Sequence, residues 1–298
     1  MAETHSTPWR TIHSAHHHCG WDNALEPVTT VAPGETLTMQ CLDAAGGHYK
    51  PGSTAADIAR MDPSKVNPVT GPVFIDGAEP GDALKVTIRD FAPSGFGWSA
   101  IIPGFGLLAD QFTAPRLQLW DYDRTAKTPA VFNTHASVPL KPFAGTIGVA
   151  LAEPGVHDII PPRRTGGNMD IRDMAAGTEL YLPVEVCGTA IESAMDITVT
   201  LDLVKGAAPA FPRFSTPGPV TRHLDAKGYE ATTGIGPDLM TAARDAVSGM
   251  IDHLSRWRGL SPEDAYLLCS VCGDLRISEV VDAPNWVVSF YFPRIVFE

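Results

Sequence analysis

Hydrophobic and polar residues alternate over many short stretches of this chain. In "ALKVTIRDF" (residues 83–91), Leu84, Val86 and Ile88 alternate with polar residues, and "ITVTLDLV" (residues 197–204) repeats the pattern. A period of two is typical of a strand with one buried face and one face towards water. Proline and glycine are spread through the chain, as expected where turns join many short strands.

A second periodicity appears near the C-terminus. Apolar residues recur at spacings of three and four over residues 237–257, which predicts a long helix with the opening proline in its first turn. A second helix is expected after Ser261, whose hydroxyl can cap it. The pattern predicts a mainly β protein, with a sandwich-like β domain over residues 1–208. A smaller α/β part over residues 209–298 carries the long helix.

Composition excludes several classes of partner. The chain has 298 residues, of which 44% are hydrophobic, so it can build a substantial core. Its formal charge of −12 and the lack of a basic stripe argue against nucleic acid and membrane partners. No signal peptide or membrane-spanning segment is recognisable. Five scattered cysteines fit reduced thiols in the cytoplasm better than a disulfide framework.

Two of the cysteines, Cys269 and Cys272, form a C-x-x-C pair at the end of the second expected helix. No second pair follows to complete a zinc ribbon. We predict that both are buried, not bonded to each other and without metal.

The stretch "TIHSAHHHCGWDN" (residues 11–23) concentrates histidines beside an aspartate. On an unbroken strand His16, His18 and Asp22 would share one face. Imidazole and carboxylate groups are common zinc ligands, so these three are candidate metal ligands. Their spacing alone equally fits a polar stretch that lies in solvent.

Two glycine-rich stretches are candidate site loops. "TGGNMDIRD" (residues 165–173) would hold Asn168 and Asp170 on a tight turn, although an ordinary polar turn has the same composition. In "PGFGLLAD" (residues 103–110), Phe105 would line a narrow pocket or simply form a corner. Neither a phosphate-binding glycine motif nor the G-x-S-x-G of α/β hydrolases is present.

Taken together, the motifs resemble the acetamidase/formamidase family, in family order and over nearly the whole chain. The matching stretches are "GWDNALEPVTTVAPGETL", "GPVFIDGAEPGDALKVTI", "PGFGLLADQF", "TGGNMDIRDMAAGTELYLPV", "VCGTAIES" and "GDLRISEVVD". The resemblance implies hydrolysis of small linear amides to ammonia and a carboxylate. It also implies a homodimer and a divalent metal site, for which zinc is the candidate.

Amide hydrolysis requires a nucleophilic water, donors for the oxyanion and a proton for the leaving amine. A metal-assisted mechanism would place Asp22 and Asp170 near the ion, with His16 or His18 as ligands. The remaining roles would be filled as follows: Glu185 as general base and proton shuttle, Asn168 as a further catalytic residue, Gly166 and Gly167 as oxyanion donors, and Phe105 as a pocket wall. We predict that Asp22, Asn168, Asp170 and Glu185 converge on one cavity.

One departure from the family pattern concerns the junction of Val184 and Glu185. The family usually carries an insert here that is rich in Gly, Asp, His and Gln, whereas "LYLPVEVCGTAIES" joins the flanks directly. Glu185 resembles the last residue of the missing run. The shortened junction leaves an alternative open, in which the chain is a catalytically impaired scaffold or small-molecule binder.

Overall fold

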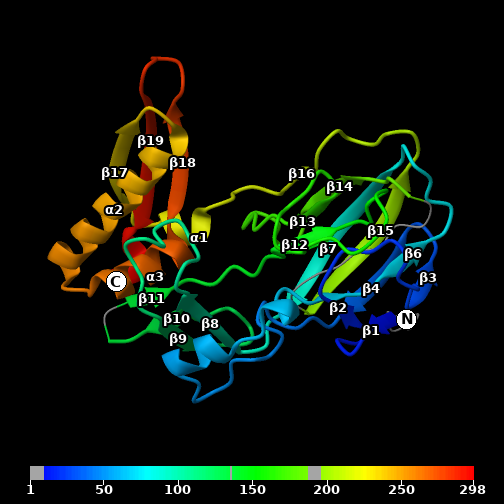
Figure 1. Cartoon of the computed structure of the whole chain (residues 1–298), viewed down its shortest axis with the longest axis horizontal. Helices are drawn as coiled ribbons and strands as arrows, with labels where there is room; N and C mark the ends of the chain where they lie inside the picture. Colours follow the sequence, from blue (N-terminus) through cyan, green and yellow to red (C-terminus); the bar gives the residue numbers. More distant parts are fainter. Residues whose placement is uncertain (1–9, 135, 187–195) are drawn as a thin grey trace, which may run out of the picture. The chain divides into compact units, whose positions relative to one another are not determined.

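The computed structural model describes residues 10–134, 136–186 and 196–298, and the chain forms two compact units (Figure 1). Unit 1 comprises residues 1–48, 61–94 and 141–220; unit 2 comprises residues 49–60, 95–140 and 221–298. The chain passes between the units several times, whereas the sequence predicted a single boundary near residue 208. The reason is long-range pairing, because residues 95–140 pack with the C-terminal helices and strands rather than with the N-terminal sheet.

Unit 1 is built on a six-stranded sheet with the order β1-β4-β15-β7-β14-β16 (Figure 1). Its neighbours are antiparallel except for the parallel pair β1 and β4. The strands are β1 (Arg10–Ile12), β4 (Glu35–Met39), β15 (Asp196–Val204), β7 (Ala83–Ala92), β14 (Glu179–Pro183) and β16 (Arg213–Ser215).

The alternating pattern decides which face of this sheet is buried. Leu84, Val86 and Ile88 of β7 are all 0% exposed, whereas Lys85 between them is only partly buried. Complete burial of such side chains stabilises the fold by about 1.5–3 kcal/mol each. The same core takes in residues of short ladders. The remaining elements of unit 1 are β2 (His17–His18), β3 (Thr29–Val31), η2 (Pro63–Lys65), β5 (Val69–Thr70), β6 (Val73–Ile75), β12 (Thr146–Gly148) and β13 (Gly166–Asn168).

Unit 2 carries a three-stranded antiparallel sheet, β17-β19-β18, with α2 packed against β17 and β19 (Figure 1). The strands are β17 (Tyr229–Gly236), β18 (Asp274–Glu279) and β19 (Trp286–Pro293). Helices α2 (Leu239–Arg258) and α3 (Pro262–Cys272) lie where the sequence predicted helices. The start of α2 differs from the prediction: the Asp238 side chain accepts from Thr241 N at 2.8 Å and caps the helix, so Pro237 precedes it.

The other elements of unit 2 are short. They are η1 (Ala55–Arg60), β8 (Phe96–Ile101), β9 (Arg116–Asp121), β10 (Ala130–Phe132), β11 (Ala136–Val138), α1 (Arg222–Asp225) and η3 (Arg294–Phe297). Strands β8 and β9 form one hairpin and β10 pairs with β11. Their apolar residues join those of α2 and α3 in a second hydrophobic core.

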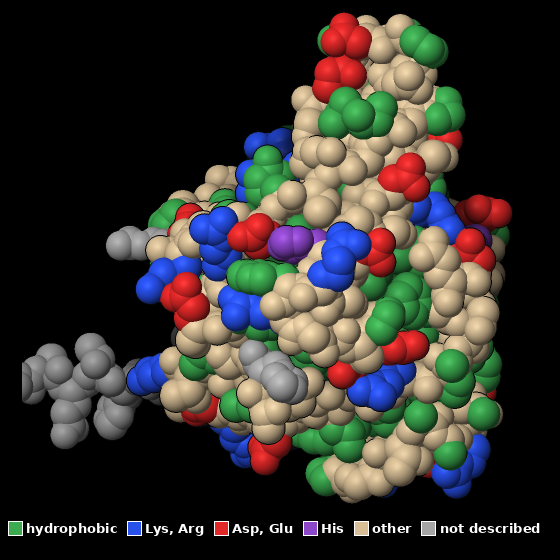
Figure 2. Space-filling model, turned by 90° about the vertical axis from the view of Figure 1, so that its left-hand side faces the viewer, with side chains coloured by type: hydrophobic (Ala, Val, Ile, Leu, Met, Phe, Trp, Pro, Cys, Tyr) green, Lys and Arg blue, Asp and Glu red, His purple; other side chains and the backbone are tan. Residues whose placement is uncertain are grey.

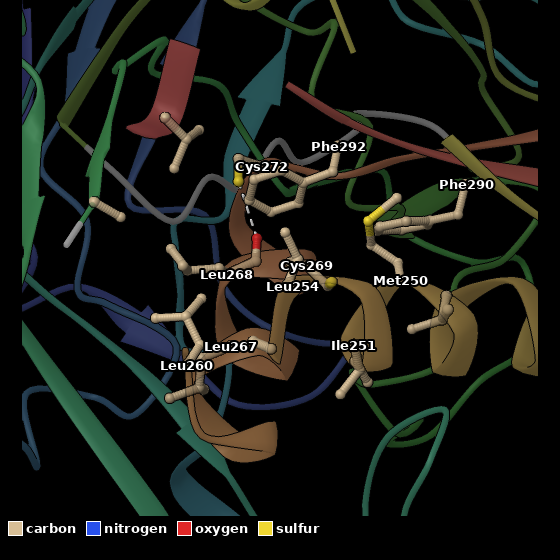
Figure 3. Packing of buried hydrophobic residues seen from close by; sticks show 14 of the residues in the cluster. Met250, Ile251, Leu254, Leu260, Leu267, Leu268, Cys269, Cys272, Phe290 and Phe292 are labelled. Atoms are coloured by element: carbon tan, nitrogen blue, oxygen red, sulfur yellow. Dashed lines mark hydrogen bonds between the residues drawn. The ribbon is translucent and has the colours of Figure 1, made fainter. Parts of the chain in front are cut away.

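The C-x-x-C pair lies in this second core (Figure 3). Cys269 and Cys272 are each 3% exposed and form no disulfide, which confirms the predicted burial. The thiol of Cys272 donates to the carbonyl of Leu268 at 3.0 Å. Burial among apolar side chains strongly raises the pKa of the Cys269 thiol. A protonated, buried thiol is a poor nucleophile and a poor metal ligand, so the pair acts as two small core residues.

Of the described residues, 34% lie in strands and 17% in helices, so the predicted mainly β class is confirmed. Within the described ranges, no helix has the length and apolar character needed to cross a membrane.

Candidate functional site

The "GWDN" stretch is anchored in unit 1 by Trp21, which is 4% exposed. Trp21 and His157 exchange backbone hydrogen bonds of 3.0 and 2.8 Å. The indole ring lies on Gly148 and Gly167, and a Cβ on Gly148 would sit 2.5 Å from the ring. Trp21 therefore joins the histidine-rich N-terminal segment to the β12–β13 hairpin.

Packing explains the two glycines of "TGGN". Gly166 and Gly167 both have positive φ, 96° and 101°, and both are buried. A Cβ on Gly166 would lie 2.5 Å from the carbonyl oxygen of Ile147. The N–H of Gly166 donates to Arg163 O at 3.0 Å and so is already used. Gly166 thus allows close packing of β13 on β12, and its N–H is bonded within the turn, whereas we expected this N–H to donate to the oxyanion.

Asn168 ends β13, and both ends of its side-chain amide are hydrogen-bonded. Its Oδ1 accepts from the hydroxyl of Thr146 at 3.0 Å, and its Nδ2 donates to Ile160 O at 3.1 Å. These bonds join β13 to β12 and to the loop that connects the two strands. The contacts favour a positioning role for Asn168 over direct chemistry.

Asp170 is the unusual member of the predicted set. Its φ of 49° lies in the left-handed region, which aspartate and asparagine adopt more readily than other residues with a side chain. Its N–H donates to Gly145 O at 3.0 Å, and its Oδ1 lies 2.6 Å from where a Cβ on Gly145 would be.

The Asp170 carboxyl is crowded on one side and open on the other. The residue as a whole is exposed, yet neighbouring atoms desolvate the carboxyl and raise its pKa above the ordinary value. Among the residues that the structure describes, none donates a hydrogen bond to this carboxyl. A desolvated, accessible carboxyl without a compensating cation is the kind of group that transfers protons.

Glu185 has the opposite environment. Its Oε1 forms an ion pair with Arg164, and its Oε2 accepts from Ala152 N at 2.9 Å. Only 11% of its side chain is exposed. Asn23 holds the same segment, donating to Leu151 O at 2.8 Å and Ala152 O at 3.3 Å. We call the hydrogen-bonded cluster of Asn23, Ala152, Arg164 and Glu185 the clamp. Within it the Glu185 carboxylate is held by its partners and lacks the open setting of a general base.

The expected metal ligands are not brought together. The chain turns at His16, whose N–H donates to His13 O at 2.9 Å, so the strand contains only His17 and His18 and the predicted common face is not formed. His18 Nδ1 lies 2.6 Å from Gly20 O. Asp22 accepts from Ala24 N at 2.9 Å in a local turn. Within the described ranges, no three His, Cys, Asp or Glu side chains gather to hold a metal, so His16, His18 and Asp22 do not fit a zinc ion as they stand.

Phe105 belongs to unit 2, apart from the unit 1 residues with which we grouped it. It is 64% exposed and lines a cavity of about 160 Å³ together with Phe112, Tyr266 and Ser270. The Tyr266 hydroxyl accepts from Leu108 N at 3.1 Å and fixes the loop. Phe105 does line a pocket, but one whose described wall is formed entirely within unit 2.

The structure brings several predicted segments into one neighbourhood of unit 1. Trp21 packs on Gly167, and Asn23 and Glu185 hold opposite sides of Ala152. Convergence of the four predicted polar side chains on one cavity stays a prediction. Arg164 was missed because no sequence signal marks it beyond its place directly before "TGGN".

Comparison with known proteins identifies the family. The profile of the Acetamidase/Formamidase family matches residues 5–157, 150–191 and 184–298, which is nearly the whole chain. The chain belongs to the acetamidase/formamidase family. It is 25% identical to a formamidase of Methylophilus methylotrophus, over 98% of this chain and 91% of that protein. It is also 25% identical to an acetamidase of Mycolicibacterium smegmatis, over 84% of each chain.

Solved structures agree with this assignment. The acetamidase of Bacillus halodurans superposes with a TM-score of 0.64 at 25% identity, over 95% of this chain and 97% of that one. A gamma lactamase from Delftia acidovorans shares the fold with a TM-score of 0.86 at 23% identity, over 96% and 90% of the two chains.

Family members carry segments that this chain lacks. The alignment with the Methylophilus formamidase extends over 385 positions, although the chain has only 298 residues. The family match is interrupted near residues 150–157 and again near residues 184–191, which include the Val184–Glu185 junction. Both interruptions adjoin the clamp, because Ala152 and Glu185 are hydrogen-bonded to each other.

Proposed function

We propose that this chain is an amidase that hydrolyses the C–N bond of small linear amides, giving ammonia and a carboxylate. Membership of the family and the relatives named formamidase and acetamidase support the reaction class. The observation that carries the proposal within the molecule is the environment of Asp170: exposed, desolvated and without a donor among the described residues.

In the proposed reaction Asp170 acts as general base. Its carboxylate takes a proton from a water molecule as the water oxygen attacks the amide carbonyl. The protonated carboxyl then gives that proton to the nitrogen as the C–N bond breaks, so Asp170 returns to its starting state. A raised pKa suits both steps, because the group then accepts and releases a proton near the working pH.

Asn168 and Glu185 would support this chemistry without exchanging protons. Asn168 fixes the hairpin from which Asp170 projects, through Thr146 and Ile160. Glu185 is held by Arg164 and Ala152. Since the candidate ligands do not fit a metal as they stand, no step here is assigned to one.

The test is ammonia release from formamide and acetamide by the full chain and by two variants. D170N keeps the size of the side chain and suits the left-handed backbone, because Asn adopts that region readily. Loss of a general base should lower kcat by roughly 10²–10⁴-fold. E185Q is the matched carboxylate control, for which we expect a lower Tm and less than about a tenfold change in kcat.

The pH profile adds a second readout. In the wild type, kcat should rise with pH as Asp170 ionises, with a midpoint above that of an ordinary aspartate. D170N should lose this limb. Full activity of D170N would overturn the role of Asp170, and a folded wild type inactive on every short amide would overturn the amidase proposal.

A further inference from the structure

Strand β18 lies at the edge of the unit 2 sheet, and no described strand pairs with its outer side. The sheet order is β17-β19-β18, and among the described strands β18 pairs only with β19. Natural edge strands of this kind are usually covered or blunted, because their outward N–H and C=O groups can pair with another chain.

The edge strand is also apolar where it is exposed. Leu275 is 44% exposed and Ile277 is 59% exposed. In the antiparallel register they lie opposite Phe290 and Val288, which are 5% and 1% exposed. Figure 2, viewed from the β17 side of this sheet, shows hydrophobic side chains lying among charged ones on that side. The apolar surface of the sheet therefore continues onto β18, beyond the strands that α2 covers.

The charges on β18 are complementary to those of a second β18. Asp274 and Arg276 flank Leu275 and project to the other face of the strand. If two copies pair antiparallel about Leu275, Asp274 of each copy lies opposite Arg276 of the other. Opposite charges in such cross-strand positions are stabilising, whereas like charges are destabilising. Arg276 already forms an ion pair with Asp274 of its own strand at 2.8 Å, so pairing would extend an alternating row of charges.

We propose that β18 is a self-association edge, and that two copies of this chain pair antiparallel through residues 273–277. The pairing joins two three-stranded sheets into a continuous six-stranded sheet and brings the two Leu275 side chains together. The interface is isologous, as a two-fold dimer requires. This inference is independent of the proposed amidase activity.

One feature of β18 argues for protection instead of pairing. The register with β19 shifts between Ile277 and Glu279, and bulges and charges are common devices that blunt an edge. The shift lies just past the segment that the dimer would use, so residues 274–277 remain regular against β19. The formal charge of −12 per chain opposes association at long range, but at physiological salt it is screened beyond about 8 Å.

Cysteine substitutions test the contact and its register. In the proposed pairing the Leu275 positions face each other across the two-fold axis, at the distance of directly opposed strand residues. L275C should therefore form an intermolecular disulfide on mild oxidation, seen as a covalent dimer on a non-reducing gel. I277C is the matched control, because the two Ile277 positions lie about 13 Å apart in this register. The wild type reports any background from native cysteines.

Exchanging the charges of Asp274 and Arg276 tests the same contact without a covalent crosslink. Sedimentation equilibrium should show a wild-type dimer, and R276D and D274R should each weaken its Kd by roughly tenfold or more through like charges. The double variant D274R/R276D should recover wild-type association, and thermal unfolding should show which variants remain folded.

Several outcomes would overturn the proposal. They are a monomeric wild type at 100 µM (about a hundred times a micromolar Kd), a crosslink at I277C but not at L275C, or a dimer indifferent to every folded charge variant. A crosslink of L275C within one chain would show that another part of the same molecule covers the edge.

Discussion

Gly155 and Gly166 share a φ of 96° but differ in their surroundings. Gly155 is exposed, and a Cβ built on it would meet nothing within 4 Å. A Cβ on Gly166 would lie 2.5 Å from Ile147 O, 3.0 Å from a methyl carbon of Leu182 and 3.1 Å from the Cα of Gly148. Comparing G155A with G166A therefore separates backbone strain, which both variants acquire, from overpacking, which only G166A acquires.

The expected magnitudes follow from these contacts. Placing alanine at positive φ costs roughly 1–2 kcal/mol in either variant. Two of the atoms facing Gly166 belong to the backbone of paired strand β12, so they cannot move away cheaply. Overpacking of this kind adds roughly 1–3 kcal/mol. For a unit of this size, 1 kcal/mol corresponds to roughly 2–4 °C, so G166A should melt roughly 2–12 °C below G155A.

The assay is thermal unfolding of the wild type and both variants under one buffer and scan rate. Far-UV circular dichroism at 25 °C would check that each is folded, and urea unfolding would give the free energy of unfolding independently. If G166A were as stable as G155A, the close packing of β12 on β13 would be refuted. That result would also refute the explanation that Gly166 in "TGGN" is required by this close packing.

Two further predictions concern a buried carboxylate and the shortened junction. Asp82 is 4% exposed, and its carboxylate accepts hydrogen bonds from Lys205, Gly206 and Glu79. The bond from Lys205 is the main cause that lowers the pKa of Asp82. The stability that the Asp82 carboxylate contributes is therefore present above the unfolded pKa near 3.9 and is lost as pH falls through the lower folded pKa. D82N should lower the free energy of unfolding by about 1–3 kcal/mol at pH 7, and the difference from wild type should shrink towards pH 3 in urea titrations; a difference independent of pH would contradict this assignment. Restoring a family-type insert between Val184 and Glu185 should raise ammonia release from acetamide or formamide by roughly 10²–10³-fold. The resemblance implies that this insert supplies polar groups to the site, and one oxyanion donor alone is worth about that factor. Equal rates from two folded proteins would show that the insert is dispensable.

Local patterns predicted what depends on local physics. Alternation in residues 83–91 correctly gave β7, and spacing of three and four correctly gave α2. The predicted start of α2 was two residues too early. Asp238 caps the helix with its side chain, so the helix begins at Leu239 and Pro237 lies outside it. The histidine face failed for a similar reason: its strand has only two residues, so the alternation did not extend to His16.

The roles of the site residues depended on partners that are distant in sequence. Glu185 and Arg164 are 21 positions apart, and no periodicity links them, yet their ion pair changes how Glu185 must be interpreted. The sequence predicted that Asn168 and Asp170 lie on a tight turn, whereas Asn168 ends strand β13 and Asp170 follows two residues later with a left-handed backbone. The desolvation of the Asp170 carboxyl by neighbouring atoms is a tertiary property that no local pattern shows. Motif order can select candidate residues, whereas only packing distinguishes a carboxylate held in an ion pair from one available for proton transfer.

The position of the two interruptions explains how this chain can be short and still keep the family fold. Ala152 and Glu185, next to the interruptions, are in hydrogen-bond contact, so segments leaving from these points can be lost without separating the strands between them. The six-stranded sheet needs neither segment: β14 keeps its register with β7 up to Pro183, and the buried face of β7 is complete. Shorter connections also cost less loop-closure entropy, although the gain is small. We therefore expect loss of the segments to act on the clamp residues Asn23, Arg164 and Glu185 rather than on the core, so that catalysis can change while the fold is kept.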